Sequence, residues 1–159
     1  MDFRVGNGYD VHQLAEGLPL VLGGVRIPHT KGCVAHSDGD VLIHALCDAL
    51  LGALALGDIG QHFPDTSADY AGIDSRILLA RVAEMVRGVG WEIVNVDNTL
   101  LAQKPKIAPF VPAMRQALAD TLGLPVDAVS VKATTTERLG FVGREEGVAA
   151  YATCLLRKA

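Results

Sequence analysis

Three side chains in the first third of the chain have the types and spacing of a metal site. Asp10 and His12 stand two residues apart near the end of an expected strand over residues 3–12, so both side chains point to one face of that strand. Such a pair is a weak signal on its own, because most Asp-x-His pairs are satisfied surface or core residues. A third candidate ligand, His44, lies further along in a strongly apolar segment.

The segment around His44 predicts a buried helix. It begins at Ser37 or Asp38, with residues 37–40 as a capping box, and ends near Leu56, and apolar residues cover nearly its whole circumference. The polar exceptions are spaced by four and share one stripe: Asp40, His44 and Asp48. His44 could simply form a hydrogen bond with an aspartate of the same stripe. Alternatively, His44 could be a third metal ligand beside Asp10 and His12. One carboxylate and two imidazoles suit zinc and leave a fourth position open.

Two further segments could hold phosphate groups. Lys132 lies in an apolar strand over residues 129–133, and three threonines and Glu137 follow it. Hydroxyls, a lysine and turning backbone amides suit phosphate oxygens, and magnesium typically bridges a carboxylate to substrate phosphates. The simpler alternative is a strand end with Glu137 capping the next turn. His36 and Ser37 precede the buried helix, either as helix-entry hydrogen-bonding residues or as an anion site at its N-terminus.

The elements that must position these residues are strands and helices in mixed order, with one hairpin. Apolar patterning and turn residues predict strands over residues 3–12, 91–102, 129–133 and 148–156, a hairpin over 20–27, helices over 37–56, 74–89 and from Pro109 or Pro112 to 122, and a loop over 57–73. This order indicates one α+β domain over residues 1–159. We expect a ferredoxin-like sandwich, with a mixed four- or five-stranded sheet covered on one face by helices.

Composition excludes several classes of protein. The chain has 159 residues, 50 % hydrophobic and 20 % charged, which is globular rather than disordered composition. A net charge of -4 argues against a nucleic-acid partner. No apolar run approaches the length of a membrane span, and the N-terminus lacks a signal peptide's apolar core. Three scattered cysteines predict no disulfide framework, so we expect a cytoplasmic protein.

The motifs together resemble one family along essentially the whole chain, the 2-C-methyl-D-erythritol 2,4-cyclodiphosphate synthases. The matching segments are Gly6-x-Gly8-Tyr9-Asp10-x-His12, Gly23-Gly24-Val25-Arg26-Ile27-Pro28, His36-Ser37-Asp38-Gly39-Asp40-x-x-x-His44, Gly57-Asp58-Ile59-Gly60, Phe63-Pro64-Asp65-Thr66, Ala102-Gln103-x-Pro105-Lys106 and Lys132-Ala133-Thr134-Thr135-Thr136-Glu137-x-Leu139-Gly140-Phe141.

The resemblance implies an enzyme of the non-mevalonate isoprenoid pathway, a phosphorus-oxygen lyase. Its substrate would be 4-diphosphocytidyl-2-C-methyl-D-erythritol 2-phosphate, and its products the cyclic diphosphate and CMP. It implies a homotrimer with active sites between subunits. It also implies Zn²⁺ on Asp10, His12 and His44, Mg²⁺ or Mn²⁺ on Glu137, and catalytic roles for His36, Thr135 and Glu137.

The same resemblance implies contacts with the substrate along five parts of the chain. These contacts are Asp10, His12, His36 and Ser37; Asp58, Ile59, Gly60, Phe63, Pro64, Asp65, Thr66 and Ser67; Ala102, Gln103, Lys104, Pro105, Lys106, Ile107 and Ala108; Lys132, Thr134, Thr135, Thr136 and Glu137; and Phe141 and Arg144. The last two residues also match the lining of an apolar channel on the family's threefold axis, which can hold isoprenoid diphosphates.

Two other functions would use the same residues. A non-catalytic metal- or nucleotide-binding protein would gain nothing from a carboxylate at Glu137 beside phosphate-binding threonines. A metal-dependent phosphohydrolase would yield CMP and a linear bisphosphate instead of a cyclic product.

Overall fold

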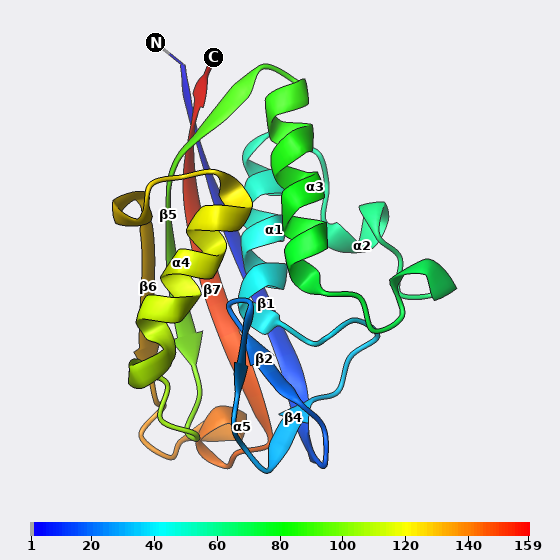
Figure 1. Cartoon of the computed structure of the whole chain (residues 1–159), viewed down its shortest axis with the longest axis vertical. Helices are drawn as coiled ribbons and strands as arrows, with labels where there is room; N and C mark the ends of the chain where they lie inside the picture. Colours follow the sequence, from blue (N-terminus) through cyan, green and yellow to red (C-terminus); the bar gives the residue numbers. More distant parts are fainter. Residues whose placement is uncertain (1) are drawn as a thin grey trace.

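The computed structural model describes residues 2–159 and contains a five-stranded sheet with the strand order β4-β1-β7-β5-β6 (Figure 1). Its strands are β1 (Phe3–Glu16), β4 (Lys31–Cys33), β5 (Trp91–Leu101), β6 (Val129–Thr134) and β7 (Gly147–Lys158). β5 and β6 run parallel, and the other neighbours are antiparallel. A separate hairpin pairs β2 (Leu20–Leu22) with β3 (Val25–Ile27). The expected mixed sheet is confirmed.

Three long helices lie on one face of this sheet: α1 (Val41–Ala53), α3 (Ser75–Gly88) and α4 (Val111–Leu122). Short helices and 3₁₀ turns occupy the connections: α2 (Ile59–His62), α5 (Gly140–Gly143), η1 (Ala68–Tyr70), η2 (Ala108–Phe110) and η3 (Val126–Ala128). The expected α+β sandwich with helices on one face is therefore confirmed. Within residues 2–159, no helix has the length and apolar character needed to cross a membrane.

Helix α1 packs unusually close to β1 because β1 has two glycines beneath it. A Cβ atom on Gly6 would lie 1.9 Å from the Ala49 carbonyl oxygen, and one on Gly8 would lie 1.9 Å from the Ala45 oxygen. No other residue type fits at either position without moving the helix. The near-continuous apolar surface of α1 is buried between the sheet and α3, as the sequence predicts.

The start of α1 differs from the prediction. The helix begins at Val41, and Asp40 is its N-cap, accepting a hydrogen bond from the Ile43 N–H through its side chain. The expected capping box over residues 37–40 is wrong. Gly39 has a positive φ of 77°, and Asp38 directs its carboxylate to the first residue of α3 instead. The Asp40 carboxylate also accepts hydrogen bonds from the N–H groups of Gly23 and Gly24, which anchors the β2–β3 hairpin to α1.

Other boundaries agree within a few residues, with two exceptions. Asp74 caps α3 as predicted, and its side chain accepts a hydrogen bond from the Arg76 N–H. β4 was not predicted, because a three-residue strand with a central glycine carries almost no periodic signal. The expected loop over 57–73 also contains α2 and η1.

The sheet face away from the helices is partly apolar and exposed. The exposed apolar side chains of β1 and β7 include Phe3, Val5, Tyr9, Val11 and Tyr151. The rings of Tyr9 and Tyr151 lie 4.9 Å apart across the two paired strands. A contiguous apolar surface of this kind is typical of a face that another protein covers.

Candidate active site

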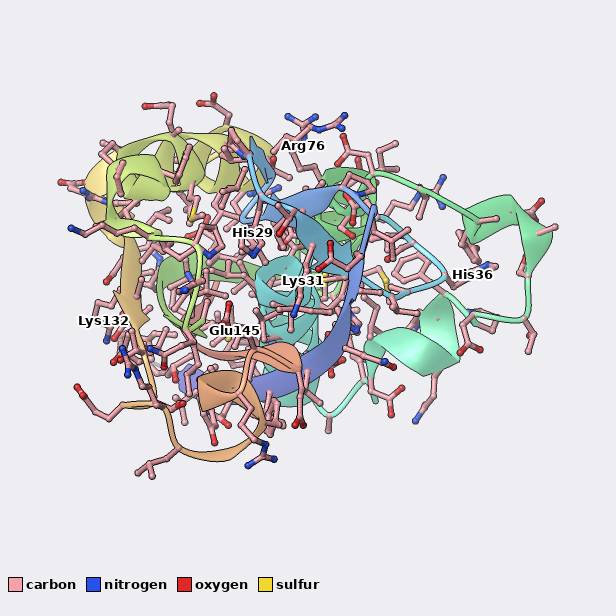
Figure 2. The ribbon with its side chains drawn as sticks, turned by 90° about the horizontal axis from the view of Figure 1, so that it is seen from below. His29, Lys31, His36, Arg76, Lys132 and Glu145 are labelled. Carbon is pink, nitrogen blue, oxygen red and sulfur yellow. The ribbon has the colours of Figure 1, made fainter. Side chains whose placement is uncertain are left out.

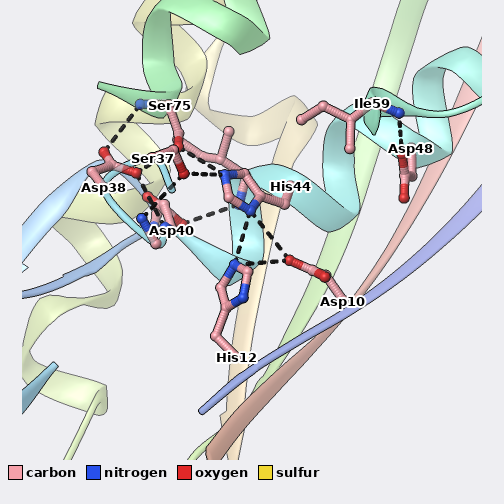
Figure 3. Close-up of polar contacts among 12 residues, drawn as sticks. Asp10, His12, Ser37, Asp38, Asp40, His44, Asp48, Ile59 and Ser75 are labelled. Atoms are coloured by element: carbon pink, nitrogen blue, oxygen red, sulfur yellow. Dashed lines mark hydrogen bonds and ion pairs between the residues drawn. The ribbon is translucent and has the colours of Figure 1, made fainter. Parts of the chain in front are cut away.

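Asp10 and His12 on β1 meet His44 on α1 where the helix packs on the strand (Figure 3). The His12 Nε2 atom lies 2.9 Å from His44 Nδ1 and 3.1 Å from Asp10 Oδ2, and His44 Nδ1 lies 3.2 Å from the same oxygen. These residues form a group of possible metal ligands whose coordinating atoms all lie within 4.8 Å of one another. The structure thus brings together the three residues that the sequence singled out.

The spacing of the three atoms fits a metal ion. Ligands about 2.0–2.1 Å from a tetrahedral zinc lie roughly 3.3 Å from one another, close to the separations in this cluster. Two ring nitrogens and a carboxylate oxygen all face one point, and their lone pairs repel unless a proton or a cation lies between them. A divalent cation satisfies all three at once, so the donor set and geometry suit zinc.

Burial and charge act differently on the two histidines. For His12, burial is the largest effect and lowers the pKa, although the nearby Asp10 charge partly opposes it. For His44, burial also lowers the pKa. The hydrogen bond to Asp10 and the charges of Asp10, Asp40 and Asp38 together outweigh it, so the His44 pKa is raised. A surplus of carboxylates around two imidazoles creates a field that attracts a cation.

The other ring nitrogen of His44 faces two hydroxyl groups. His44 Nε2 lies 3.1 Å from Ser37 Oγ and 3.0 Å from Ser75 Oγ. The Ser75 hydroxyl donates to Asp38 Oδ1 over 2.5 Å, and the Ser75 backbone N–H donates to Asp38 Oδ2 over 3.0 Å. Figure 3 shows these contacts on the far side of the imidazole from Asp10 and His12.

A cavity of about 290 Å³, here named the metal cavity, opens beside the three candidate ligands. Its lining residues are Asp10, His12, His36, Ser37, His44, Ile59, Gly60, Phe63, Asp65, Tyr70 and Leu78. The edge-to-face pair Phe63 and Tyr70 has ring centroids 5.5 Å apart and gives the cavity an aromatic side. Among the expected substrate contacts in residues 58–67, the lining leaves out Asp58, Pro64, Thr66 and Ser67.

Two side chains hold the segment around α2, which borders this cavity, against the rest of the protein. His36 Nε2 lies 2.7 Å from the Ser67 carbonyl oxygen, so this ring holds the segment after α2 in place. Asp48, the last residue of the polar stripe on α1, accepts a hydrogen bond of 2.7 Å from the Ile59 N–H. The stripe therefore does three separate tasks: Asp40 anchors the hairpin, His44 faces the strand pair, and Asp48 positions the start of α2.

The expected substrate contacts in residues 102–108, with Thr134 and Thr135, line a second, separate pocket of about 300 Å³, here named the nucleotide pocket. It is formed by Ala102, Gln103, Lys104, Pro105, Lys106, Ile107, Ala108, Ala133, Thr134 and Thr135, with a cis peptide between Lys104 and Pro105. The two pockets share no lining residue. Figure 2 shows His36 and Lys132 on opposite sides of the molecule.

Five other expected residues, on β6 or after it in the chain, do not line the second pocket: Lys132, Thr136, Glu137, Phe141 and Arg144. Lys132 pairs with Asp97 at 2.8 Å. Glu137 is exposed, has a positive φ of 53°, and donates its backbone N–H to Thr135 Oγ1 rather than joining the three metal-ligand candidates. Thr136 and Phe141 line a cavity of about 280 Å³ beside α5. Phe141 and Arg144 also line a cavity of about 590 Å³, together with His12.

Sequence reasoning missed the supports behind His44. Ser75 was not singled out, because a serine at the first position of a helix is ordinary and nothing local connects it to residue 44. Asp38 was assigned to the start of the nearer helix. Tyr70 and Leu78, which line the first cavity, carry no motif.

Comparisons with known proteins agree with the motifs. The YgbB family profile matches residues 3–157. The chain is 63 % identical to the 2-C-methyl-D-erythritol 2,4-cyclodiphosphate synthase of Thioalkalivibrio sulfidiphilus, over 98 % of this chain and 97 % of that protein. It is 62 % identical to the synthase of that name from Pseudomonas aeruginosa, over 96 % of this chain and 98 % of that protein.

Solved structures are also similar. The bifunctional IspDF of Campylobacter jejuni superimposes with a TM-score of 0.96 at 47 % identity, over 99 % of this chain and 43 % of that one. A 2C-methyl-D-erythritol-2,4-cyclodiphosphate synthase in a CDP-bound form gives a TM-score of 0.89 at 39 % identity, over 97 % of this chain and 100 % of that one. With its fold, its convergent Asp-His-His cluster and these matches, the chain belongs to the YgbB family of 2-C-methyl-D-erythritol 2,4-cyclodiphosphate synthases.

Proposed function

We propose that this chain converts 4-diphosphocytidyl-2-C-methyl-D-erythritol 2-phosphate to 2-C-methyl-D-erythritol 2,4-cyclodiphosphate and CMP, a step of non-mevalonate isoprenoid synthesis. The observation that carries the proposal is the meeting of Asp10, His12 and His44 beside a cavity, in a chain 63 % identical to a synthase of that name. The free, buried cysteines agree with the cytoplasmic location that we propose.

The reaction needs no nucleophile from the protein. An oxygen of the substrate's 2-phosphate forms a bond to the β-phosphorus, while the bond from that phosphorus to the bridging oxygen breaks. The bridging oxygen leaves with the electron pair as part of CMP. The work of the protein is to hold two anionic groups in line and to keep water from the β-phosphorus.

Two groups of residues would share the charge neutralisation. Asp10, His12 and His44 would hold Zn²⁺, and Glu137 would hold Mg²⁺ or Mn²⁺. When bound, the two cations would add positive charge beside the diphosphate, in a protein whose net charge is -4. His36 and Thr135 would contact the reacting phosphates. Asp58 and Gly60 would bind the ribose.

We further propose that the complete site lies between subunits of a homotrimer. The metal cavity and the nucleotide pocket share no residue, and His36 and Lys132 lie on opposite sides of one chain. The apolar outer face of β1 and β7 offers a surface for neighbouring copies. In a closed ring, each metal cavity can face the nucleotide pocket of the next chain.

The decisive experiment follows the phosphorus atoms. Purified protein is incubated with the substrate, zinc and magnesium, and the products are identified by phosphorus NMR. Cyclic diphosphate and CMP in equal amounts are expected. CMP with a linear bisphosphate would show that water attacks instead, and the protein would then be a phosphohydrolase. Binding of CMP without turnover would support a non-catalytic role.

A further inference from the structure

Ser75 and Asp38 lie behind His44, on the side of the ring away from the expected metal, and neither belongs to the ligand set. Ser75 is fully buried at the first position of α3. Its Oγ atom lies 3.0 Å from His44 Nε2 and 2.5 Å from Asp38 Oδ1. A neutral imidazole carries one proton on one of its two nitrogens, and the partner of one nitrogen decides the state of the other.

The protons in this chain of contacts can be assigned by counting donors. Asp38 accepts three hydrogen bonds: from the Ser75 hydroxyl and the Asp40 N–H on Oδ1, and from the Ser75 N–H on Oδ2. A carboxylate has no proton to give, so the single hydroxyl proton of Ser75 points to Asp38. The lone pairs of Ser75 Oγ therefore face His44 Nε2.

We propose that Asp38 and Ser75 are positioning residues that fix the tautomer of His44, with the proton on Nε2 and the lone pair of Nδ1 directed toward Asp10 and His12. A proton on Nδ1 could point to Asp10 Oδ2 at 3.2 Å, but the lone pair of Nε2 would then face the lone pairs of the fully buried Ser75 Oγ at 3.0 Å. With the proton on Nε2, the His12 Nε2–H can instead fill the space between Asp10 Oδ2 at 3.1 Å and His44 Nδ1 at 2.9 Å. The Nε2–H tautomer turns this repulsion into a hydrogen bond and leaves Nδ1 ready to coordinate a cation.

Ser37 touches the same nitrogen but does not decide its state. Its Oγ lies 3.1 Å from His44 Nε2 and accepts a hydrogen bond from the Gly39 N–H. Its own proton is not held by a carboxylate, so this hydroxyl can donate to or accept from Nε2. Ser37 and Ser75 are therefore a matched pair: the same residue type in contact with the same atom, only one of them fixed in direction.

Zinc affinity separates the two serines. The inference rests on the proposed metal site, so affinity is measured by competition with a chromophoric chelator for the wild type, Ser75→Ala, Asp38→Asn and Ser37→Ala. Loss of a group that orients a metal-bound histidine typically weakens binding about 10- to 100-fold. We expect a loss of this size for Ser75→Ala and Asp38→Asn, and a clearly smaller one for Ser37→Ala.

A nitrogen-15 NMR spectrum of the histidine rings shows which nitrogen of His44 carries the proton. If Ser75 had a purely structural role, its loss would not change this proton position. In the metal-free wild type, at a pH where the ring is neutral, the His44 proton is expected on Nε2. In Ser75→Ala the proton is expected to populate Nδ1 as well. A wild-type proton on Nδ1 would overturn the proposal even if Ser75→Ala failed to fold.

The affinity outcomes also distinguish this inference from the proposed function. Wild-type zinc affinity in both Ser75→Ala and Asp38→Asn would overturn the positioning role and leave the metal site intact. Equal losses in Ser37→Ala and Ser75→Ala would overturn it as well, because any hydroxyl near Nε2 would then serve. No zinc binding by the wild type would overturn the metal site itself, and with it this inference.

Discussion

The metal cavity and the nucleotide pocket differ in how deeply the side chains around them are buried and hydrogen-bonded. Behind the metal-ligand candidates, Asp40 and Ser75 are fully buried and hydrogen-bonded to backbone or carboxylate groups. Around the nucleotide pocket, the Lys132–Asp97 pair is largely exposed, at 58 % and 45 % of the side-chain surface, and Glu137 lies on an open turn. Buried side chains hold the metal-ligand candidates in place, whereas the nucleotide pocket combines the end of β6 with the segment over residues 102–108 and has more exposed side chains around it.

This difference indicates where each half obtains its rigidity. Ligands to a small cation must be placed within a few tenths of an ångström, so packing inside the subunit has to fix them. A nucleotide has many contact points and tolerates a wall made from a second chain. This agrees with the proposal that a neighbouring subunit completes the nucleotide pocket.

The sharpest test of this comparison mixes two kinds of variant subunit. One kind lacks a residue of the metal half of the proposed active site, and the other lacks a residue of the nucleotide half. His44→Ala is expected to lose its zinc, and both His44→Ala and Glu137→Ala are expected to be inactive alone. When the two variants are denatured together in equal amounts and refolded, about one site in four should receive two intact halves in a closed ring. Recovered activity near a quarter of wild type is the expected result. Mixed trimers, verified by mass spectrometry, that stay inactive would place both halves on one chain.

A milder change isolates the charge on the open half. Glu137→Gln keeps the shape of the side chain and removes its charge, so turnover should fall by about 10²-fold or more, the scale for one preorganised charge-stabilising group. Zinc content and thermal unfolding should match the wild type, because Glu137 is exposed and separate from the three metal-ligand candidates. Full activity would return Glu137 to a turn-capping role.

Substitutions in the buried half should instead lower the free energy of unfolding. Asp40→Ala leaves three backbone N–H groups, on Gly23, Gly24 and Ile43, without their acceptor, which should lower the free energy of unfolding by about 2–4 kcal/mol. Lys132→Ala, the matched change in the exposed half, should lower it by less than about 1 kcal/mol. Urea unfolding of both variants measures the contrast, and equal losses would contradict it.

The pH dependence of the Asp40→Ala effect can be worked out as well. Burial raises the pKa of the Asp40 carboxyl to about 6, although three N–H groups donate to it. Since its unfolded value is about 4, the folded state holds the extra proton, and the stabilisation from Asp40 falls as pH rises from about 4 to 6. The cost of Asp40→Ala should therefore be larger at the acidic end of this window. A cost that grows with pH would show that the hydrogen bonds outweigh burial.

The smallest expected effect concerns residues 63–73, which contribute Phe63, Asp65 and Tyr70 to the lining of the metal cavity and which we propose act as a lid over it. Apart from the packed rings of Phe63 and Tyr70, the segment has few large apolar side chains, so its amides should exchange quickly in the free protein and more slowly with a substrate analogue. The Gly72 N–H, which donates to the His36 carbonyl oxygen over 2.7 Å, should be the slow exception in both states. Equal protection of the whole segment with and without ligand would count against a lid.

Sequence patterning was sufficient for what depends on near neighbours. Alternation and caps located the long strands and α3, and the spacing of Asp10 and His12 put both on one face of β1. Sequence patterning failed where contacts between residues far apart in the sequence determine the local structure. Asp38 and Asp40 are equally good caps by local chemistry, and the choice is made by the Gly23 and Gly24 N–H groups from the hairpin. The role of Ser75 depends on the packing of α3 against α1, which no local pattern shows.

The close packing of α1 on Gly6 and Gly8 affects how this part of the protein responds to heat and pressure. Helix and strand backbones touch there with no side chain between them, so this contact contains almost no compressible free volume. The same helix carries His44 and the same strand carries Asp10 and His12. Heating or hydrostatic pressure should therefore change the separation of the ligand atoms far less than it changes the nucleotide pocket, and the protein should keep the dimensions of its cation site well toward the conditions at which it unfolds.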